Sequence, residues 1–224
     1  MEEERIGPQP SQPPADAPSA ATPPLAIPAW RDGLPELLNP TVLLREVGVE
    51  DAPALLAHLG TAEVSRFIQP LPTTVEGFEG LITSARRERA DGRGVCYSVV
   101  PAGGDHAVGI FRLTALEAGF ATAEGTCVLG SAYWGSGLFL ATARMVLDFA
   151  FDTLGVVRLE ARAVTMDGRG NGALRKVGAV QEGVLRRSFK RYGKRYDQLL
   201  WSVLAEDWRL QTRGRSRPAH RSRP

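Results

Sequence analysis

The chain of 224 residues is poor in the residues that build disulfide scaffolds and metal sites, with two cysteines and three histidines. Cys96 and Cys127 lie in separate strand-like segments and form no Cys-x-x-Cys pair, which argues against a disulfide framework or a cysteine-based metal site. His58, His106 and His220 are scattered along the chain, and no metal is expected. Apolar runs are also short. None approaches the ~18 residues needed to span a bilayer, so we exclude an integral membrane protein.

The charge is nearly balanced overall but unevenly distributed. The chain has 27 Lys and Arg against 25 Asp and Glu, a formal net charge of +2. Residues 1–30 are acidic and hold eight of the 16 prolines, and residues 209–224 contain six arginines and no acid. Both ends are too polar to bury a core, so we expect a disordered leader, one domain over 31–208 and a disordered arginine-rich tail. The leader has no basic start followed by an apolar stretch, so no secretory signal is expected and the cytoplasm is the expected compartment.

Within 31–208 the apolar pattern alternates between strand and helix periods. The order predicted is β-α-α-β-β-β-α-β-α-β-β, which indicates a mixed α/β (α+β) domain with one central sheet. The predicted strands are 41–47, 95–100, 107–113, 121–129, 157–163, 179–188 and 195–204, and the predicted helices are 50–59, 73–90, 138–154 and a short one ending at Gly178.

The segment that bears chemistry is a strand, a glycine-rich turn and a long helix. The turn reads Trp134-Gly135-Ser136-Gly137-Leu138-Phe139. Glycines let the backbone approach an anion, and a helix N-terminus offers free N–H groups and a positive dipole, which predicts a phosphate site. The alternative is that the glycines only pack the helix closely on the sheet. No Lys-Ser/Thr pair follows them, which excludes a P-loop, and the strands that precede the turn exclude a dinucleotide fold.

Several stretches together resemble one family. They are Ala123-Glu124, Tyr133 to Leu138, Leu147 to Phe151, Val157 to Ala161, Asn171 to Ala179, Glu182 to Arg186 and Asp197 to Ser202. These residues resemble the GNAT N-acetyltransferase superfamily, in particular its branch of ribosomal-protein-alanine acetyltransferases. The resemblance implies the GNAT fold: a twisted, mostly antiparallel mixed sheet of about seven strands with about four helices. Its two central strands splay apart, with acetyl-CoA in the resulting V and its pyrophosphate on the turn.

The resemblance also assigns the site. Glu124 takes the position of an acid that often serves as the base, directly or through water; the alternative is a solvated or salt-bridged strand carboxylate. The oxyanion donor would be a backbone N–H in Cys127–Leu129. Asn171 would contact the pantetheine or else cap the last helix. The residues expected to bind the cofactor are Cys127, Val128, Leu129, Trp134, Gly135, Ser136, Gly137, Leu138, Phe139 and Asn171.

The sequence departs from the family pattern at four positions. Phe139 is bulky where the turn usually ends in glycine or alanine. Asp167 and Gly170 replace a common asparagine and serine, and Leu174 stands where many relatives carry a tyrosine that protonates the departing thiolate. The proton donor is therefore unassigned.

The function expected is transfer of an acetyl group from acetyl-CoA to a primary amine, on a protein N-terminus or a small molecule, by direct attack on the thioester. One alternative is a catalytically silent acyl-CoA-binding module. The other is an RNA- or ribosome-associated protein that uses its basic tail. The partners expected are acetyl-CoA and the amine acceptor, with no membrane, nucleic acid only through the tail, and a monomer or homodimer.

A cluster of cations lies in the last predicted hairpin: Arg186, Arg187, Lys190, Arg191, Lys194 and Arg195. The cluster is either a solvated edge of the sheet or a surface that attracts an acidic partner, such as the cofactor's 3′-phosphate, RNA or an acidic substrate.

Overall fold

The computed structural model describes residues 29–215. Most of the leader and the end of the tail that the sequence predicts to be disordered lie outside these residues. The helices and strands are β1 (Leu37–Leu38), β2 (Val42–Glu46), α1 (Ala52–Leu59), α2 (Val75–Ala90), β3 (Gly94–Pro101), β4 (Gly109–Ala115), β5 (Thr122–Leu129), α3 (Leu138–Asp152), β6 (Arg158–Val164), α4 (Gly168–Val177), β7 (Val180–Arg191), β8 (Lys194–Leu204) and α5 (Ala205–Arg215).

The sheet has eight strands in the order β1-β2-β3-β4-β5-β6-β8-β7. All neighbours are antiparallel except β5 and β6, which are parallel. The mixed sheet agrees with the sequence prediction. The sequence predicted about seven strands and about four helices, one fewer of each than the structure has. The strand that was missed is β1, which has only two residues, and the helix that was missed is α5.

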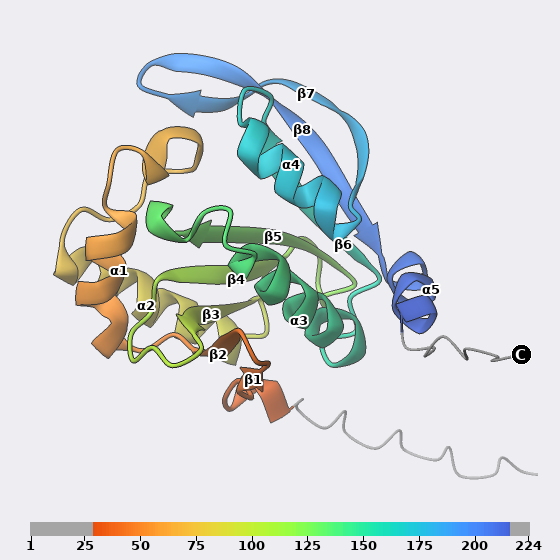
Figure 1. The fold of residues 1–224 in the computed structure, drawn as a ribbon, viewed down its shortest axis with the longest axis horizontal. Coiled ribbons are helices and arrows are strands. Elements are labelled where there is room, and N and C mark those ends of the chain that lie inside the picture. Colours follow the sequence, from red (N-terminus) through yellow and green to blue (C-terminus); the bar gives the residue numbers. More distant parts are fainter. Residues whose placement is uncertain (1–28, 216–224) are drawn as a thin grey trace, which may run out of the picture.

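Two apolar clusters cover opposite faces of the sheet, because strand side chains alternate between the faces. On β4, Phe111 and Leu113 belong to the cluster that contains α3, whereas Ile110 belongs to the cluster formed with α1 and α2. Figure 1 shows α3 on one side of β3–β5 and α1 and α2 on the other. The first half of the sheet is therefore sandwiched between helices.

Helix α5 extends the ordered domain beyond residue 208, where the sequence analysis placed its end. Trp208 is 2% exposed, and its Nε1 donates a hydrogen bond of 2.7 Å to Asp148 Oδ1 on α3. Helix α5 continues to Arg215, and Nη2 of Arg209 donates a hydrogen bond of 3.0 Å to Phe151 O, so ordered structure continues past residue 208. None of the helices within 29–215 is long and apolar enough to cross a membrane.

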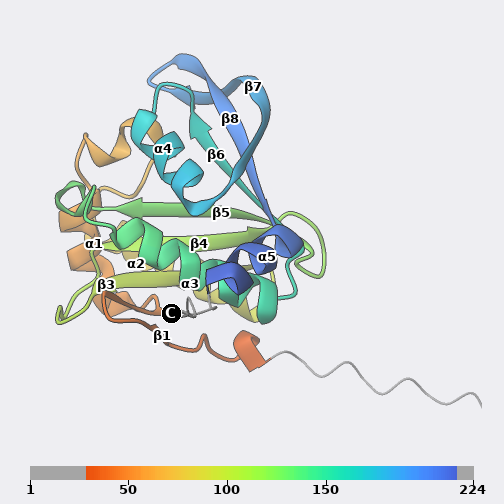
Figure 2. The ribbon, with the colours of Figure 1, turned by 45° about the vertical axis from the view of Figure 1, so that its right-hand side comes forward.

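The central feature of the sheet is the divergence of β5 from β6. The two strands pair only at Thr122↔Arg158, Ala123↔Leu159 and Glu124↔Glu160. Beyond these positions β5 continues with β4, and β6 continues with β8. Figure 2 shows the two strands separating, with α4 and the β7–β8 hairpin on one side and β3–β5 on the other. The sheet thus opens into a V whose closed end is at Glu124.

Candidate active site

The inner edges of the V carry backbone groups without a neighbouring strand. On the β4 side, Thr122 O accepts a hydrogen bond from Leu116 N, and Gly130 N donates one to Val108 O. Backbone groups alternate in direction along an antiparallel strand, so the even-numbered residues of β5 bond β4. The N–H groups of the odd-numbered Cys127 and Leu129 therefore point away from β4 and into the V. The Val128 N–H points the other way, into the β4 ladder. Of the three amides that the sequence nominated as oxyanion donors, two therefore face the opening.

The opposite edge of the V is built in the same way. Thr165 N bonds Asp197 O, and Ala205 N bonds Val157 O, so the odd-numbered positions of β6 pair with β8. The backbone of Arg162 accordingly points toward β5. Buried backbone groups need partners, and two unpaired strand edges that face one another suit an extended ligand that carries amide groups.

The glycine-rich turn joins β5 to α3 at the open end of the V. Gly135 and Gly137 have φ of 76° and 88°, in the left-handed region where only glycine is unstrained, and no atom lies within 4 Å of a Cβ added at either position. Within the described residues, the N–H groups of Gly135, Phe139 and Leu140 have no backbone or side-chain acceptor. Free N–H donors together with the positive end of a helix dipole are the groups that helix N-termini present to anions.

Ser136 and Leu138 stabilise this turn from within. The Ser136 hydroxyl donates to Tyr133 O at 2.7 Å and accepts from Leu138 N at 3.3 Å. The serine thus fixes the shape of the turn, and the phosphate site expected there is made of main-chain donors.

Trp134 fastens the turn to the sheet. Its Nε1 donates to Leu129 O at 3.0 Å, and the guanidinium carbon of Arg169, at the start of α4, lies 3.5 Å from the centre of its ring. This cation–π contact spans the V from the β5 side to the β6 side. No sequence motif pointed to Arg169, because the contact joins residues 35 positions apart.

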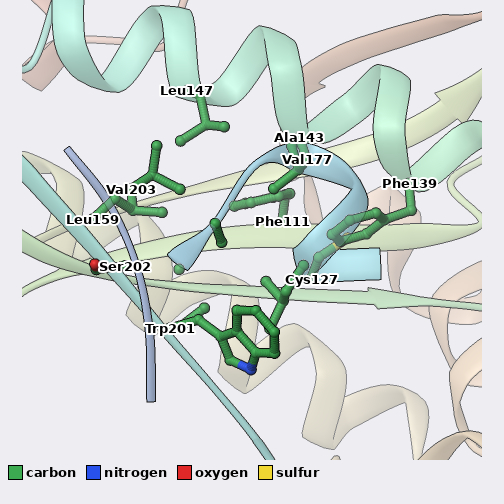
Figure 3. Close-up of a pocket in the computed structure, with 14 residues that line it drawn as sticks. Phe111, Cys127, Phe139, Ala143, Leu147, Leu159, Val177, Trp201, Ser202 and Val203 are labelled. Atoms are coloured by element: carbon green, nitrogen blue, oxygen red, sulfur yellow. The ribbon is translucent and has the colours of Figure 1, made fainter. Parts of the chain in front are cut away.

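An apolar pocket lies under the V on the α3 and α4 side. It encloses about 430 Å³, including its open mouth. Figure 3 shows Phe139 and Ala143 of α3, Cys127 and Phe111 of the sheet, and Trp201 of β8 around this space. The bulky Phe139 thus lies on the wall of the pocket. Its lining is apolar, which suits the apolar part of a small ligand.

Cys127 contributes to the same wall, and its thiol is not activated. Burial raises the pKa of the Cys127 thiol to about 12, so that the thiolate is disfavoured at neutral pH. A covalent acyl-cysteine mechanism at Cys127 is therefore unsupported.

Glu124 lies on the face of the sheet opposite this pocket. Along β5, Ala123 and Cys127 face α3, whereas Val128 faces α1 and α2, and Glu124 has the register of Val128. Its Oε1 lies 3.6 Å from Nε of Arg162, and its side chain is 29% exposed. The carboxylate is thus ion-paired yet open to solvent at the closed end of the V.

A chain of alternating charges continues from Glu124 across the sheet. Arg162 also approaches Glu160 at 3.7 Å, and Arg158 bonds Glu160 at 3.0 Å and forks onto Glu182. The alternation of Arg158, Glu160 and Arg162 with apolar residues was visible in the sequence, but the partner of each charge was not.

Asn171 has a structural role. It lies in the second turn of α4 and is 6% exposed. Its Nδ2 donates to Val164 O and Asp167 O at 2.9 and 2.8 Å, and its Oδ1 accepts from Trp201 Nε1 at 3.0 Å. The side chain therefore ties α4 to β6 and β8. The cap of α4 is instead Asp167, whose Oδ1 accepts from Gly170 N at 2.9 Å.

Comparison with known proteins identifies the family. The sheet is split by a V, and a glycine-rich turn with free N–H groups lies at its open end. A family profile described as an acetyltransferase (GNAT) domain matches residues 41–180, and the chain belongs to this family. The GNAT fold that the resemblance implied is thus confirmed, and so is the resemblance itself.

Individual relatives are distant but cover most of the chain. A Bacillus licheniformis protein named Uncharacterized N-acetyltransferase p20 is 23% identical over 173 residues, which is 77% of this chain and 97% of the relative. The structure of Mycobacterium smegmatis RimJ in complex with CoA-disulfide superposes with a TM-score of 0.72 at 24% identity and covers 84% of this chain and 97% of that one. The ribosomal-protein-S5-alanine acetyltransferase from Vibrio fischeri gives a TM-score of 0.70 at 17% identity and covers 77% and 98%.

Proposed function

We propose that the chain is an acetyl-CoA-dependent N-acetyltransferase that moves the acetyl group to a primary amine, on a protein N-terminus or a small molecule. The observation that carries this proposal is the junction of two features: the unpaired strand edges of the V, and the free N–H groups of the turn at its open end. Together they match a ligand with amide groups at one end and a pyrophosphate at the other. The acetyltransferase family and the RimJ structure with a bound CoA derivative support the same ligand.

In this arrangement the turn from Trp134 to Phe139 holds the pyrophosphate with the N–H groups of its backbone. The pantetheine lies along the edges of β5 and β6. The Cys127 or Leu129 N–H faces the thioester carbonyl and stabilises the charge that develops on its oxygen.

The acceptor amine enters from the face that carries Glu124. Its nitrogen attacks the thioester carbon, the carbon–sulfur bond breaks, and the amine proton passes to Glu124 directly or through water. The guanidinium of Arg162, with Nε 3.6 Å from Oε1 of Glu124, forms an ion pair with this carboxylate. CoA leaves as the thiolate, which takes a proton from solvent. Leu174, at the position of the family's tyrosine, has no proton to give.

The test combines binding with turnover. Purified chain is incubated with acetyl-CoA and a panel of amines (peptides with free N-termini, polyamines and aminoglycosides), and released CoA thiol is measured. The variant Glu124→Gln is compared with Glu182→Gln, which removes a carboxylate on the outer strand β7. Loss of a general base lowers kcat by about 10²–10⁴. We expect this loss for Glu124→Gln alone, with an unchanged KM for acetyl-CoA.

The outcomes separate the alternatives. Undiminished turnover of Glu124→Gln across the pH range would remove the base assignment and leave the transferase intact. Tight acetyl-CoA binding without thiol release for any amine would support the silent acyl-CoA-binding module instead.

A further inference from the structure

The β7–β8 hairpin extends beyond the rest of the sheet. Strand β6 ends at Val164, which pairs with Gln198, whereas β7 and β8 continue as a two-stranded ribbon to the turn at Tyr192-Gly193. Figures 1 and 2 show this ribbon projecting past β6 and α4. It leaves the sheet at the carboxyl end of β6, the same end at which the V opens.

The ribbon is held in one conformation. Tyr192 and Gly193 have φ of 46° and 73°, as a two-residue hairpin turn of type I′ requires. A bulge lies between Leu185 and Phe189. In this bulge Arg187 adopts φ of 50°, and its N–H donates to Asp197 Oδ1 at 2.7 Å. A bulge increases the local twist and redirects the strands beyond it.

An aromatic anchor fixes the ribbon above the bulge. Phe189 is 2% exposed, and its ring centre lies 6.4 Å from that of Tyr196. The hairpin is therefore a preorganised projection, which loses little conformational entropy on binding a partner.

The ribbon carries charge of one sign. Between Leu185 and Tyr196 there are six cations and no acid: Arg186, Arg187, Lys190, Arg191, Lys194 and Arg195. None of the six forms an ion pair with any residue in the described part of the chain, whereas Arg45, Arg89, Arg112 and Arg158 are all paired.

Like charges also face one another across the ribbon. Lys190 pairs with Arg195, and Arg191 pairs with Lys194. Like charges directly opposite each other in a sheet are destabilising. The isolated protein therefore bears a cost that a polyanion would remove.

The distribution of the cations selects the kind of polyanion. Successive strand residues point to opposite faces, so Lys190 and Arg195 lie on one face of the ribbon and Arg191 and Lys194 on the other. An acidic peptide would neutralise one face. A nucleic-acid groove has phosphates on both walls and can admit a two-stranded ribbon between them.

The tip of the hairpin carries a second feature that suits a nucleic acid, an exposed aromatic ring beside a guanidinium. Tyr192 is 77% exposed, and the guanidinium carbon of Arg191 lies 4.5 Å from the centre of its ring. Exposed aromatic and arginine planes are the surfaces on which proteins stack unpaired bases.

We propose that the β7–β8 hairpin, from Arg186 to Arg195, binds the phosphodiester backbone of a nucleic acid. This site is separate from the predicted basic tail and does not depend on the proposed acetyl transfer. Since its contacts are to phosphates, it confers affinity rather than sequence specificity.

The experiment measures the salt dependence of binding by the full-length chain. Fluorescently labelled probes are an RNA stem–loop, a DNA duplex of matched length and a polyglutamate peptide, and anisotropy titrations run from 50 to 200 mM KCl. The hairpin variant replaces Lys190, Arg191, Lys194 and Arg195 with Gln. The control variant replaces four exposed cations elsewhere, Arg87, Arg93, Arg144 and Lys176, with Gln. Both variants lose the same charge and keep the same tail, and circular dichroism checks their folding.

Each phosphate contact contributes about 0.9 to the slope of log K against log[salt] on duplex DNA. Loss of four contacts therefore lowers the slope by about 3.6. Over the fourfold change in salt, the affinity of the wild-type protein should fall by a factor on the order of 10² more than that of the hairpin variant. We expect the control variant to keep the wild-type slope.

The arms of the test assign the partner. Binding to RNA and DNA alike supports contacts to the phosphates, and preference for RNA supports the same site with added contacts to the 2′-hydroxyl. Equal slopes for the hairpin and control variants, or tighter binding of polyglutamate than of either nucleic acid, would overturn the proposal. So would a hairpin variant that loses acetyl-CoA affinity while its nucleic-acid affinity is unchanged.

Discussion

The glycine turn offers a substitution whose effects on stability and on ligand binding can be separated. Gly137 is the N-cap of α3 and has φ of 88°, and no atom lies within 4 Å of an added Cβ. The variant Gly137→Ala therefore meets backbone strain without a steric clash. The left-handed conformation costs an L-residue about 1–2 kcal/mol. For a chain of this size, that loss lowers Tm by about 2–8 °C.

The effect on binding has a different origin. Relief of the strain would turn the first N–H groups of α3 away from the anion. One hydrogen bond to a charged group contributes about 1.5–3 kcal/mol, so its loss raises the Kd for acetyl-CoA roughly 10- to 100-fold.

The matched control lies beyond the other end of α3. Gly155 has φ of 75° and equally open space around its Cα. Gly155→Ala should lower Tm by a similar amount and leave the Kd for acetyl-CoA unchanged. Thermal unfolding and titration calorimetry measure the two quantities on both variants. Equal Kd changes in the two variants, or none in Gly137→Ala, would refute the assignment of the turn to phosphate binding.

Other substitutions test the packing and the titrating groups. Asp51 is 2% exposed and binds Arg45 through both carboxylate oxygens. The variant Asp51→Ala removes the buried carboxylate from this pair, so it should lower the free energy of unfolding, measured in urea, by about 3–5 kcal/mol. A loss below about 1 kcal/mol would contradict this role. Burial and the nearby charge of His106 lower the pKa of His58 below 6.5, so the unfolded chain binds more protons as pH falls through the 6s and the native state loses stability. His58→Gln should flatten the fall in unfolding free energy between pH 7 and pH 5, and parallel curves for the two proteins would be the contrary result. Burial raises the pKa of Cys96 to about 12, so iodoacetamide at pH 8 should label it far more slowly in the native protein than in urea, and equal rates followed by mass spectrometry would contradict its burial.

The sequence predicted most of the fold because its signals are local. The helix and strand periods located seven strands and four helices, and the resemblance to the GNAT superfamily implied the V. Strand β1 was missed because two residues, Leu37 and Leu38, are too few to establish a period. Helix α5 was missed because it is polar after Trp208, and its anchor is a hydrogen bond to Asp148, 60 residues earlier.

The candidate site was predicted less completely because its details depend on contacts between distant segments. Alternation within β5 decides that the Cys127 and Leu129 N–H groups, and not that of Val128, face the V, and this needs the register with β4. The three hydrogen bonds of Asn171 come from a strand, a loop and another strand, so no local pattern indicates them. The roles of Glu124 and of the turn in acetyl transfer stay predictions, which the variants above test.

For the β7–β8 hairpin, the sequence showed the residues but not their arrangement. Its cations were evident in the sequence, and two interpretations remained open. The structure adds the observations on which the nucleic-acid proposal rests: a rigid ribbon, cations on both of its faces and none of them in an ion pair within the described residues. The sequence showed that the hairpin is cationic. The strand register showed that the cations lie on both of its faces, which is why we expect a partner with a groove lined by phosphates.

The most direct test of the central claim is calorimetric titration of the purified chain with acetyl-CoA, followed by measurement of thiol release with the amine panel. The V and its turn predict saturable binding at one site per chain, weakened at least tenfold by Gly137→Ala, and thiol release that requires an amine. Failure of the wild-type chain to bind acetyl-CoA at millimolar concentration would contradict the account.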